Sequence, residues 1–253
     1  MSAVPDSAGY PAASILRDAT PWLSIIVPVL DDAPALDALL ERLRPLRTQG
    51  VELIVVDGGS RDDSVALACA RSTCVLTAPA GRARQMNAGA ALARGQALLF
   101  LHADSVPPDS VDALIGAALG HGAHWGRFDV CLEGRDRRLG LVARLMNLRS
   151  RLSGIATGDQ AIFVRADSFV QVGGYPEQAL MEDIELSRRL KRLGRPQCLA
   201  GPVRSSGRRW DEHGFWRTVT LMWWLRLAYR LGLAPDRLAR WYYGRGPRGT
   251  AGA

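Results

Sequence analysis

The chain has 253 residues, of which 47% are hydrophobic, and carries a formal net charge of +7 at neutral pH. This length fits one large α/β domain or two small domains, and the hydrophobic content allows a sizeable buried core. The charge favours anionic partners, namely nucleotide phosphates, nucleic acid or an acidic membrane surface, whereas no apolar run is long enough to predict a membrane-spanning helix.

The N-terminal segment and the cysteines bear on the compartment. Residues 1–20 lack the basic segment and the following apolar segment of a secretory signal. We therefore expect a disordered N-terminal tail and a cytoplasmic protein, with peripheral contact at the inner face of the cell membrane left open. The four cysteines show no CxxC pair and no metal-ligand spacing, which predicts small buried side chains in a reducing compartment.

The first half of the chain alternates between short apolar runs and amphipathic segments. Strands are expected at 23–30, 51–56, 73–77 and 98–101, and helices at 34–46, 61–70, 82–94 and 111–119. This alternation is typical of an α/β fold with a mostly parallel sheet flanked by helices.

Asp104 follows the most apolar of these strands, Leu98 to Leu101, and Pro107 and Pro108 prevent the strand from continuing. In open α/β sheets, ligands bind beyond the carboxyl ends of the strands. Asp104 is therefore expected at the place where such a fold carries out its chemistry.

The turn after the second strand also carries candidate ligand-binding groups. Gly58 and Gly59 allow close approach of the backbone to a ligand, and Asp57 could hydrogen-bond a base or a ribose. Ser60 with Asp63 fits a capping box for the next helix. An ordinary tight turn with an aspartate cap explains the same residues equally well.

Two arginines, Arg82 and Arg84, fall in the first turn of the helix predicted over 82–94. Cations at this place oppose the helix dipole. The unfavourable placement favours an anion bound between them and the helix N-terminus, although a solvated basic face is the alternative.

The second half of the chain has a different pattern. An exposed strand is expected at 124–133, a basic helix at 135–151, a short apolar run at 161–164 and a charged helix from about Met181. A C-terminal helix rich in tryptophan and arginine is expected within 215–233. It could lie on an anionic membrane surface, or pack on the sheet as an ordinary terminal helix. Residues 244–253 are expected to be a disordered tail.

Five motifs occur in an order that is specific when they are taken together. They are Ser24-Ile-Ile-Val-Pro-Val29, Val55 to Ser64, Asn87-Ala-Gly89, Leu99 to Asp104, and Gly173 to Glu177 followed by Glu182-Asp183. This set resembles family 2 glycosyltransferases of the GT-A fold. The combination of 81–87 with His102-Ala-Asp104 resembles a bacterial branch of small members, some acting on carotenoid or other lipid acceptors.

The resemblance implies a GT-A domain at 21–210, a C-terminal helical segment at 211–243, and an inverting transfer from a nucleotide-diphosphate sugar. It implies that Pro28 and Asp57 line the pocket for the nucleotide base. Asp104 would bind a divalent cation, Mg²⁺ or Mn²⁺, on the diphosphate. The other nucleotide-binding residues implied are Gly59, Arg82, Arg84 and Asn87.

On the acceptor side, the resemblance implies that Asp183 is the general base, with Glu182 as its neighbour and a second candidate. Asp159 and Gln160 would line the sugar or acceptor. Simple helix N-terminal charge is the alternative explanation for the pair of carboxylates at 182–183.

The sequence departs from the family pattern at several positions. His102 stands where the metal-binding motif usually has its first aspartate, so His213 is considered as a second metal ligand. The segment around Arg209 and Trp210 has Ser206 in place of the glutamine of processive members. This favours transfer of a single sugar, with Arg209 and Trp210 contacting the diphosphate or the acceptor.

Three other functions were considered. A nucleotidyltransferase would need a basic glycine-rich loop after the first strand, and 31–34 does not supply one. A basic non-catalytic module on a membrane or nucleic acid, and a catalytically weak sugar-nucleotide binder, are the remaining alternatives. No motif interleaves aromatic residues with arginine, so nucleic acid is not expected as a partner. The expected partners are a nucleotide-diphosphate sugar and a small-molecule or lipid acceptor with a hydroxyl or carboxylate.

Overall fold

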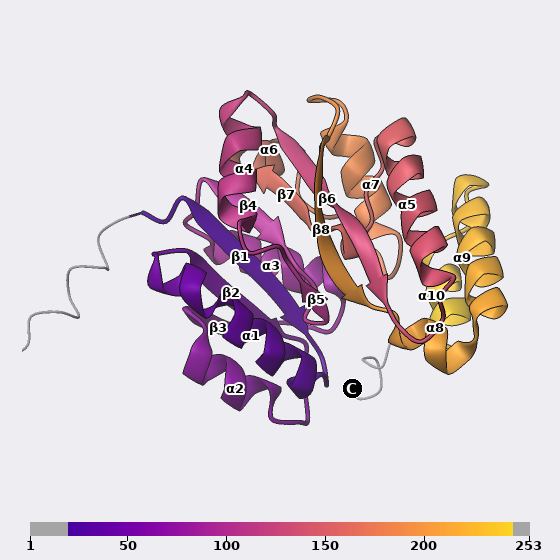
Figure 1. The fold of residues 1–253 in the computed structure, drawn as a ribbon, viewed down its shortest axis with the longest axis horizontal. Coiled ribbons are helices and arrows are strands. Elements are labelled where there is room, and N and C mark those ends of the chain that lie inside the picture. Colours follow the sequence, from indigo (N-terminus) through magenta and orange to yellow (C-terminus); the bar gives the residue numbers. More distant parts are fainter. Residues whose placement is uncertain (1–19, 245–253) are drawn as a thin grey trace, which may run out of the picture.

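A single mixed sheet forms the centre of the protein (Figure 1). The computed structural model describes residues 20–244, and its sheet has eight strands in the order β3-β2-β1-β4-β7-β6-β8-β5. The strands are β1 (Leu23–Val29), β2 (Glu52–Asp57), β3 (Cys74–Thr77), β4 (Ala97–Phe100), β5 (Ser105–Val106), β6 (Trp125–Glu133), β7 (Ile162–Arg165) and β8 (Gln197–Ser206).

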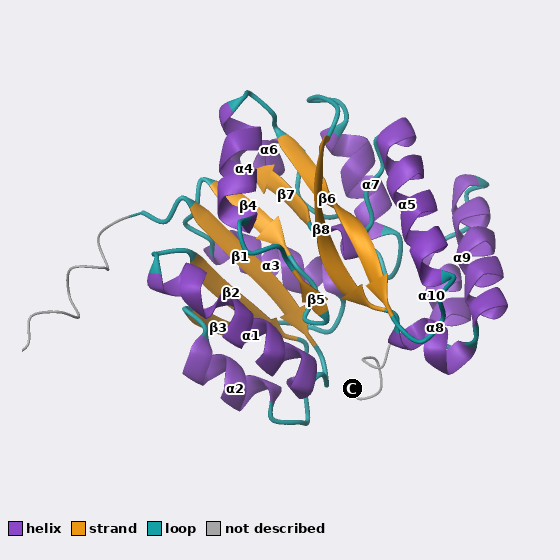
Figure 2. Ribbon diagram, in the orientation of Figure 1, coloured by secondary structure: helices purple, strands orange, loops and turns teal. Residues whose placement is uncertain are grey.

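Helices connect the strands and cover both faces of the sheet (Figure 2). They are α1 (Ala33–Thr48), α2 (Ser64–Arg71), α3 (Arg82–Leu92), α4 (Val111–Gly120), α5 (Leu139–Ser153), the short 3₁₀ helix η1 (Gly158–Gln160), α6 (Ala166–Gln171), α7 (Glu182–Leu190), α8 (Arg208–His213), α9 (Phe215–Arg230) and α10 (Pro235–Tyr243). The expected α/β fold class is thus confirmed.

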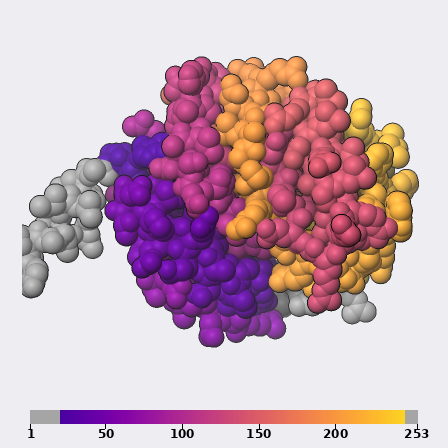
Figure 3. Space-filling model, viewed as in Figure 1, coloured from indigo at the N-terminus to yellow at the C-terminus, as the bar shows by residue number. Residues whose placement is uncertain are grey.

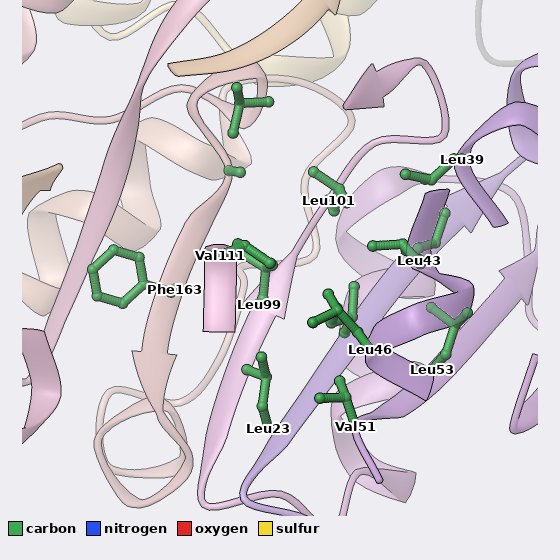
Figure 4. Packing of buried hydrophobic residues seen from close by; sticks show 14 of the residues in the cluster. Leu23, Leu39, Leu43, Leu46, Val51, Leu53, Leu99, Leu101, Val111 and Phe163 are labelled. Atoms are coloured by element: carbon green, nitrogen blue, oxygen red, sulfur yellow. The ribbon is translucent and has the colours of Figure 1, made fainter. Parts of the chain in front are cut away.

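The first four strands pair in parallel, and every residue of β1, β2 and β4 is buried. A strand covered by helices on both faces must be apolar throughout, which is why these segments are continuous hydrophobic runs. On one face α1, α2 and α4 bury residues such as Leu39, Leu43 and Val111 against Leu23 and Leu99 (Figure 4). On the other face α3, α6 and α7 form a second core with Ile26, Val56 and Phe100 among its members.

The sequence predicted a mostly parallel sheet, but the second half of the sheet is mixed. β7 runs antiparallel to β4 and to β6, and β5 runs antiparallel to β8, whereas β6 and β8 are parallel. β8 was not predicted, because it contains Gly201 and Pro202 and its side chains are mostly exposed or half-buried. The beginning of β6 is more buried than predicted, since β7 and β8 flank it on both sides.

The C-terminal region consists of α8, α9 and α10 rather than one helix. Leu225, Ala228 and Leu238 of α9 and α10 pack against Met181 and Ile184 at the beginning of α7, away from the strands. In the space-filling view these helices lie at the edge of the molecule next to α5 (Figure 3). The domain boundary expected at 210/211 falls inside α8. Within 20–244, no helix is long and apolar enough to span a bilayer.

Several local predictions were wrong. Ser60 and Asp63 form no capping box, because the Ser60 hydroxyl accepts a hydrogen bond from the backbone of Asp31 instead. All four cysteines are free, but Cys69 and Cys131 are exposed and the others are half-buried, so none is the buried side chain that the sequence predicted. Apart from residues 20 and 244, the tails predicted at 1–20 and 244–253 lie outside the described residues.

Candidate active site at the carboxyl ends of β1 and β4

The chain changes direction across the sheet at β1, which has β2 on one side and β4 on the other. Connections diverge at such a switch point and leave room for a ligand beyond the strand ends. Asp104 lies there in the loop after β4 and is half-buried. Its loop is held by hydrogen bonds from the Ser105 amide to the His102 carbonyl (3.1 Å) and from the Ser206 amide to the Asp104 carbonyl (3.2 Å).

The turn after β2 is built around Asp57, which is 2% exposed. Its carboxylate accepts hydrogen bonds from the amides of Gly59 (2.8 Å) and Ser60 (3.1 Å). Gly59 has φ +95°, a left-handed conformation that suits glycine. The Asp57 carboxylate therefore shapes the turn, and a bound base would share it with these amides.

Gln85 of α3 supports the same turn, and the sequence analysis did not identify it. Its side-chain amide donates to the carbonyls of Val29 (2.9 Å) and Val56 (2.8 Å), so that it ties the ends of β1 and β2 together. Pro28 lies in the buried strand β1, opposite Val56 in the register. The only sequence signal for this role was a glutamine in the Arg-rich first turn of the predicted helix.

The loop after β1 meets two other segments. Asp31 has φ +51° and its carboxylate accepts a hydrogen bond from the Arg61 amide (2.7 Å). Asp32 forms an ion pair with Arg208 of α8 (3.2 Å), and the charge of Asp104 also acts on that arginine. Hydrogen bonding to Asp32 raises the pKa of Arg208. The C-terminal helices are thereby tied to the candidate nucleotide side of the sheet.

Glu182 and Asp183 open α7, as predicted, directly after Met181 with φ +67°. Glu182 is 7% exposed, and burial and the neighbouring Asp183 carboxylate raise its pKa. Asp183 is half-buried, and its Oδ2 accepts a hydrogen bond from the Gly158 amide (2.9 Å). A left-handed residue that is not glycine costs free energy, and such strain clusters at functional sites.

Asp159 adjoins this carboxylate pair through η1. Its Oδ1 lies 3.5 Å from Nδ1 of His102, whose ring packs against Gly158. Burial opposes ionisation of Asp159, but His102, Arg82 and Arg226 together lower its pKa. His102 therefore connects the loop after β4 with the loop that holds Asp183.

The arginines that begin α3 face carboxylates. Desolvation of the guanidinium acts to lower the pKa of Arg82. The phenols of Tyr243 and Tyr242 and the carboxylate of Glu182 outweigh this effect, so that the pKa is raised. Because a phenol is neutral near pH 7, the carboxylate is the physical partner. Arg84 lies 3.9 Å from Glu177 in an exposed ion pair. Arg82 thus lies among the acidic side chains, while Arg84 borders the segment before α7.

Two predicted site residues are engaged in the scaffold. The Asn87 side chain donates to the Tyr175 carbonyl (2.8 Å) and accepts from the Tyr175 amide (3.0 Å). Gln160 is fully buried, and its side chain accepts from the Thr157 amide (3.2 Å) and donates to Asn147 (3.1 Å). Both amides position the loops that carry the acidic residues, and neither side chain has a free end.

Arg209 and Trp210 lie on α8. The Arg209 guanidinium stacks on the Tyr242 ring, 3.6 Å from its centre, and the Trp210 ring lies 5.8 Å from that of Phe215. The Nη1 atom of Arg209 is buried and has no hydrogen-bond partner within residues 20–244. This region therefore contains a hydrogen-bond donor without an acceptor, beside the aromatic end of α10.

The acidic side chains suit a divalent cation whose remaining ligands are phosphate oxygens. In residues 20–244, no three side chains of His, Cys, Asp or Glu converge as a metal cage. Mg²⁺ in nucleotide sites uses one or two carboxylates plus phosphates and water, so a single half-buried Asp104 suits it. His213 is exposed, with its Nδ1 3.3 Å from the Arg209 carbonyl, and within residues 20–244 no hydrogen bond or ion pair joins it to Asp104.

Two arginines lie near the acidic pair at 182–183. The sequence predicted them only as parts of basic helices and not as neighbours of these carboxylates. Arg149 of α5 and Arg226 of α9 lie within reach of the Asp183 charge. Burial lowers the pKa of Arg149 to about 10 and also lowers that of Arg226. Only the packing of α5 and α9 beside α7 brings these residues together.

Comparison with known proteins supports the sequence resemblance. An uncharacterized glycosyltransferase of Mycobacterium tuberculosis is 34% identical over 166 residues, covering 61% of this chain and 63% of that protein. A PGL/p-HBAD biosynthesis glycosyltransferase of Mycobacterium bovis is 32% identical over 170 residues, covering 62% and 64%. These matches thus span less than two thirds of each relative.

The fold is shared with a solved enzyme. The structure of glucosyl-3-phosphoglycerate synthase from M. tuberculosis, in complex with Mn²⁺, UDP and glucosyl-3-phosphoglycerate, has a TM-score of 0.58 and 19% identity. The likeness covers 76% of this chain and 74% of that chain, and it supports the GT-A fold. The family described as Glycosyl transferase family 2 matches residues 24–169, and the chain belongs to that family.

Proposed function

We propose that the protein transfers one sugar, with inversion, from a nucleotide-diphosphate sugar to a hydroxyl or carboxylate of an acceptor. The observation that carries this proposal is the position of Asp183. It begins α7, is tied to Gly158 of η1, and shares its surroundings with Asp159 and Arg82. These groups lie beyond the strand ends where the Asp57 turn and Asp104 also lie.

In this function the Asp57 turn binds the base or ribose, and the Gly59 backbone allows the nucleotide to approach closely. Asp104 holds Mg²⁺ or Mn²⁺ together with the diphosphate, and His213 is the second candidate ligand. The cation would neutralise the charge that develops on the leaving diphosphate. Mn²⁺ and UDP are bound by the structurally similar glucosyl-3-phosphoglycerate synthase, which supports this assignment.

Asp183 is proposed as the general base. Its carboxylate takes the proton of the acceptor hydroxyl while the oxygen bonds to the anomeric carbon and the nucleoside diphosphate leaves. The side chain of Glu182 is buried and its pKa is raised. These properties suit a neighbour of the general base better than they suit the base itself. Arg82 is proposed to contact the diphosphate, and Arg209 and Trp210 are proposed to contact the diphosphate or the acceptor.

Calorimetry with UDP, GDP and TDP, each with Mn²⁺ and with EDTA, tests the proposal. We expect one nucleotide to bind, and its affinity to fall at least about tenfold on removal of the metal or in Asp104→Asn, corresponding to ~1.4 kcal/mol. Asp167→Asn, which alters an exposed ion pair with Arg165 at the end of β7, is the matched control. Absence of binding for every nucleotide would reject the transferase and favour a basic surface module.

The acceptor could be lipid-linked or carotenoid-like, with the protein cytoplasmic and peripheral on the membrane. An exposed apolar stripe on α5 and one on α9 support this: Leu141, Leu145, Leu148, Leu152, Trp216, Trp223, Trp224, Leu227 and Leu231. Arg138 links the two helices by stacking 4.1 Å from the centre of the Phe215 ring. We expect flotation with anionic vesicles that Trp223→Ser weakens, and absence of flotation would remove the membrane assignment.

A further inference from the structure

Arg149 and Arg226 are half-buried, and their surroundings differ from those of Arg127, the buried arginine within residues 20–244. Arg127, fully buried in β6, forms an ion pair with Asp129 and donates to the Asn147 carbonyl (3.1 Å). Nε of Arg127 is also buried without a partner, but its other two guanidinium nitrogens are paired, whereas both Nε and Nη2 of Arg149 are buried and have no hydrogen-bond partner within residues 20–244. No ion pair in that part of the chain includes Arg149 or Arg226. Buried guanidinium nitrogens are normally hydrogen-bonded, so those of Arg149 call for an acceptor, and Arg226 adds a second positive charge beside it.

Separate contacts hold the two arginines near Asp183. On α5, Asn147 accepts a hydrogen bond from Gln160 of η1 (3.1 Å), which anchors the turn that carries Arg149. On α9, Leu225 packs against the beginning of α7, which anchors Arg226. η1 and α7 are joined by the hydrogen bond from Gly158 to Asp183. The position of the arginines is therefore built by the packed core.

The charges around the arginines are unbalanced. Burial and the nearby charges of Arg226 and Arg127 together lower the pKa of Arg149 to about 10, against the opposing effect of Asp183. Burial likewise lowers the pKa of Arg226, while Asp183 and Asp159 oppose that change. Both side chains keep their charge near neutral pH. A bound anion would supply the missing acceptors and relieve the repulsion between the two cations.

We propose that Arg149 and Arg226 bind an oxyanion of the acceptor, a phosphate or a carboxylate, beside the hydroxyl that Asp183 deprotonates. This assignment rests on the proposed function and names the acceptor as an anionic molecule. The donor diphosphate is a poorer candidate, because the Asp57 and Asp104 loops lie at the ends of β2 and β4, whereas α5 packs against β6. Figure 1 shows α5 and α9 together on the side of the molecule opposite β3.

The test uses inorganic phosphate and the full chain saturated with the nucleotide and Mn²⁺, so that the diphosphate site is filled. Phosphate affinity is measured by calorimetry for the parent protein, Arg149→Gln and Arg226→Gln. We expect each substitution to weaken phosphate binding by about 10- to 100-fold, as for the loss of a charge-assisted hydrogen bond. Arg144→Gln on α5 and Arg230→Gln on α9 replace exposed arginines of the same helices and should bind phosphate normally.

The outcomes separate the two proposals. Nucleotide binding with phosphate affinity that is unmeasurable, or equal in all variants, overturns the oxyanion site and leaves the transferase intact. Absence of nucleotide binding overturns the transferase and with it the role of the anion in an acceptor. Arg149→Lys and Arg226→Lys keep the charge, and we expect them to retain part of the phosphate affinity, which separates loss of charge from loss of packing.

Two sources could supply this oxyanion, and a second arm distinguishes them. Vesicles containing phosphatidic acid present a lipid phosphate monoester, whereas phosphatidylglycerol presents a diester of equal lipid character. Binding to phosphatidic acid that Arg226→Gln abolishes would identify a lipid phosphate acceptor. Binding of soluble phosphate without this vesicle preference would identify a water-soluble anionic acceptor.

Discussion

The two ends of the strands each contain a buried glutamate, and the two glutamates have opposite surroundings. At the amino ends, Glu52 accepts hydrogen bonds from the Ser24 hydroxyl (2.6 Å) and from the amide (2.8 Å) and Nε (3.0 Å) of Arg94. Burial alone would raise the pKa of Glu52, but these hydrogen bonds lower it. At the carboxyl ends, burial and Asp183 raise the pKa of Glu182.

The contrast separates a network whose groups satisfy one another from one with unmet hydrogen-bonding capacity. The groups around Glu52 satisfy one another, so they stabilise the fold and leave nothing for a ligand. The carboxyl ends hold Arg149, whose buried Nε and Nη2 have no hydrogen-bond partner within residues 20–244. They also hold Asp31, Ala161 and Met181, the non-glycine residues of 20–244 with positive φ. Strain and unmet hydrogen-bonding capacity are therefore concentrated at one end of the sheet.

The largest expected effect is on catalysis at the carboxyl ends. Asp183→Asn keeps the size of the side chain and an acceptor for the Gly158 amide, but it cannot take a proton. We expect sugar transfer to fall by about 10²- to 10⁴-fold, the usual contribution of a general base, with nucleotide affinity unchanged. Donor turnover and calorimetry measure the two quantities. Unchanged turnover would leave the helix-terminal charge as the explanation of this pair.

An intermediate effect on stability is expected at the amino ends. Ser24→Ala removes the hydroxyl that donates to Glu52 and accepts from the Gly95 amide (2.9 Å). Leaving these buried groups unpaired should cost about 1–3 kcal/mol of unfolding free energy in urea, while nucleotide binding stays unchanged. A loss of nucleotide affinity equal to that of a site variant would contradict the separation of the two ends.

The same variant has a defined pH dependence. The lowered pKa of Glu52 means that its carboxylate stabilises the fold above the usual glutamate pKa, and that this contribution is lost as the pH falls through the folded-state value. The difference in unfolding free energy between the parent protein and Ser24→Ala should therefore shrink in acid. A difference that stays constant from neutral to acidic pH would contradict this account.

The smallest effect is expected for Glu182→Gln. A raised pKa means that ionisation of Glu182 destabilises the folded state, so stability present at low pH is lost as the pH rises through the folded-state value. The amide variant avoids this loss and should be more stable by about 1 kcal/mol near neutral pH, with the gap closing in acid. Thermal unfolding across pH measures it. A variant less stable than the parent at neutral pH would show that the Arg82 interaction outweighs the repulsion.

Much of the first half could be predicted from the sequence. The apolar runs around 23–30 and 98–101 are fully buried strands, and their signal is local because neighbouring residues share the same burial. The order of strand, carboxylate and turn likewise placed Asp57 and Asp104 beyond strand ends. Gln160 and Asn87 could not be assigned from the sequence, since an amide in a motif looks the same whether it contacts a ligand or a backbone.

The sequence alone determined the family, the α/β class and the segments that carry Asp104, Glu182 and Asp183, because local hydrophobic periodicity and motif order depend on neighbouring residues. Only the tertiary structure decided that β8 completes the sheet and that α9 packs on α7. It also decided that Arg149 and Arg226 lie within reach of the Asp183 charge. Contacts between segments far apart in the chain arise from packing, which no local pattern records.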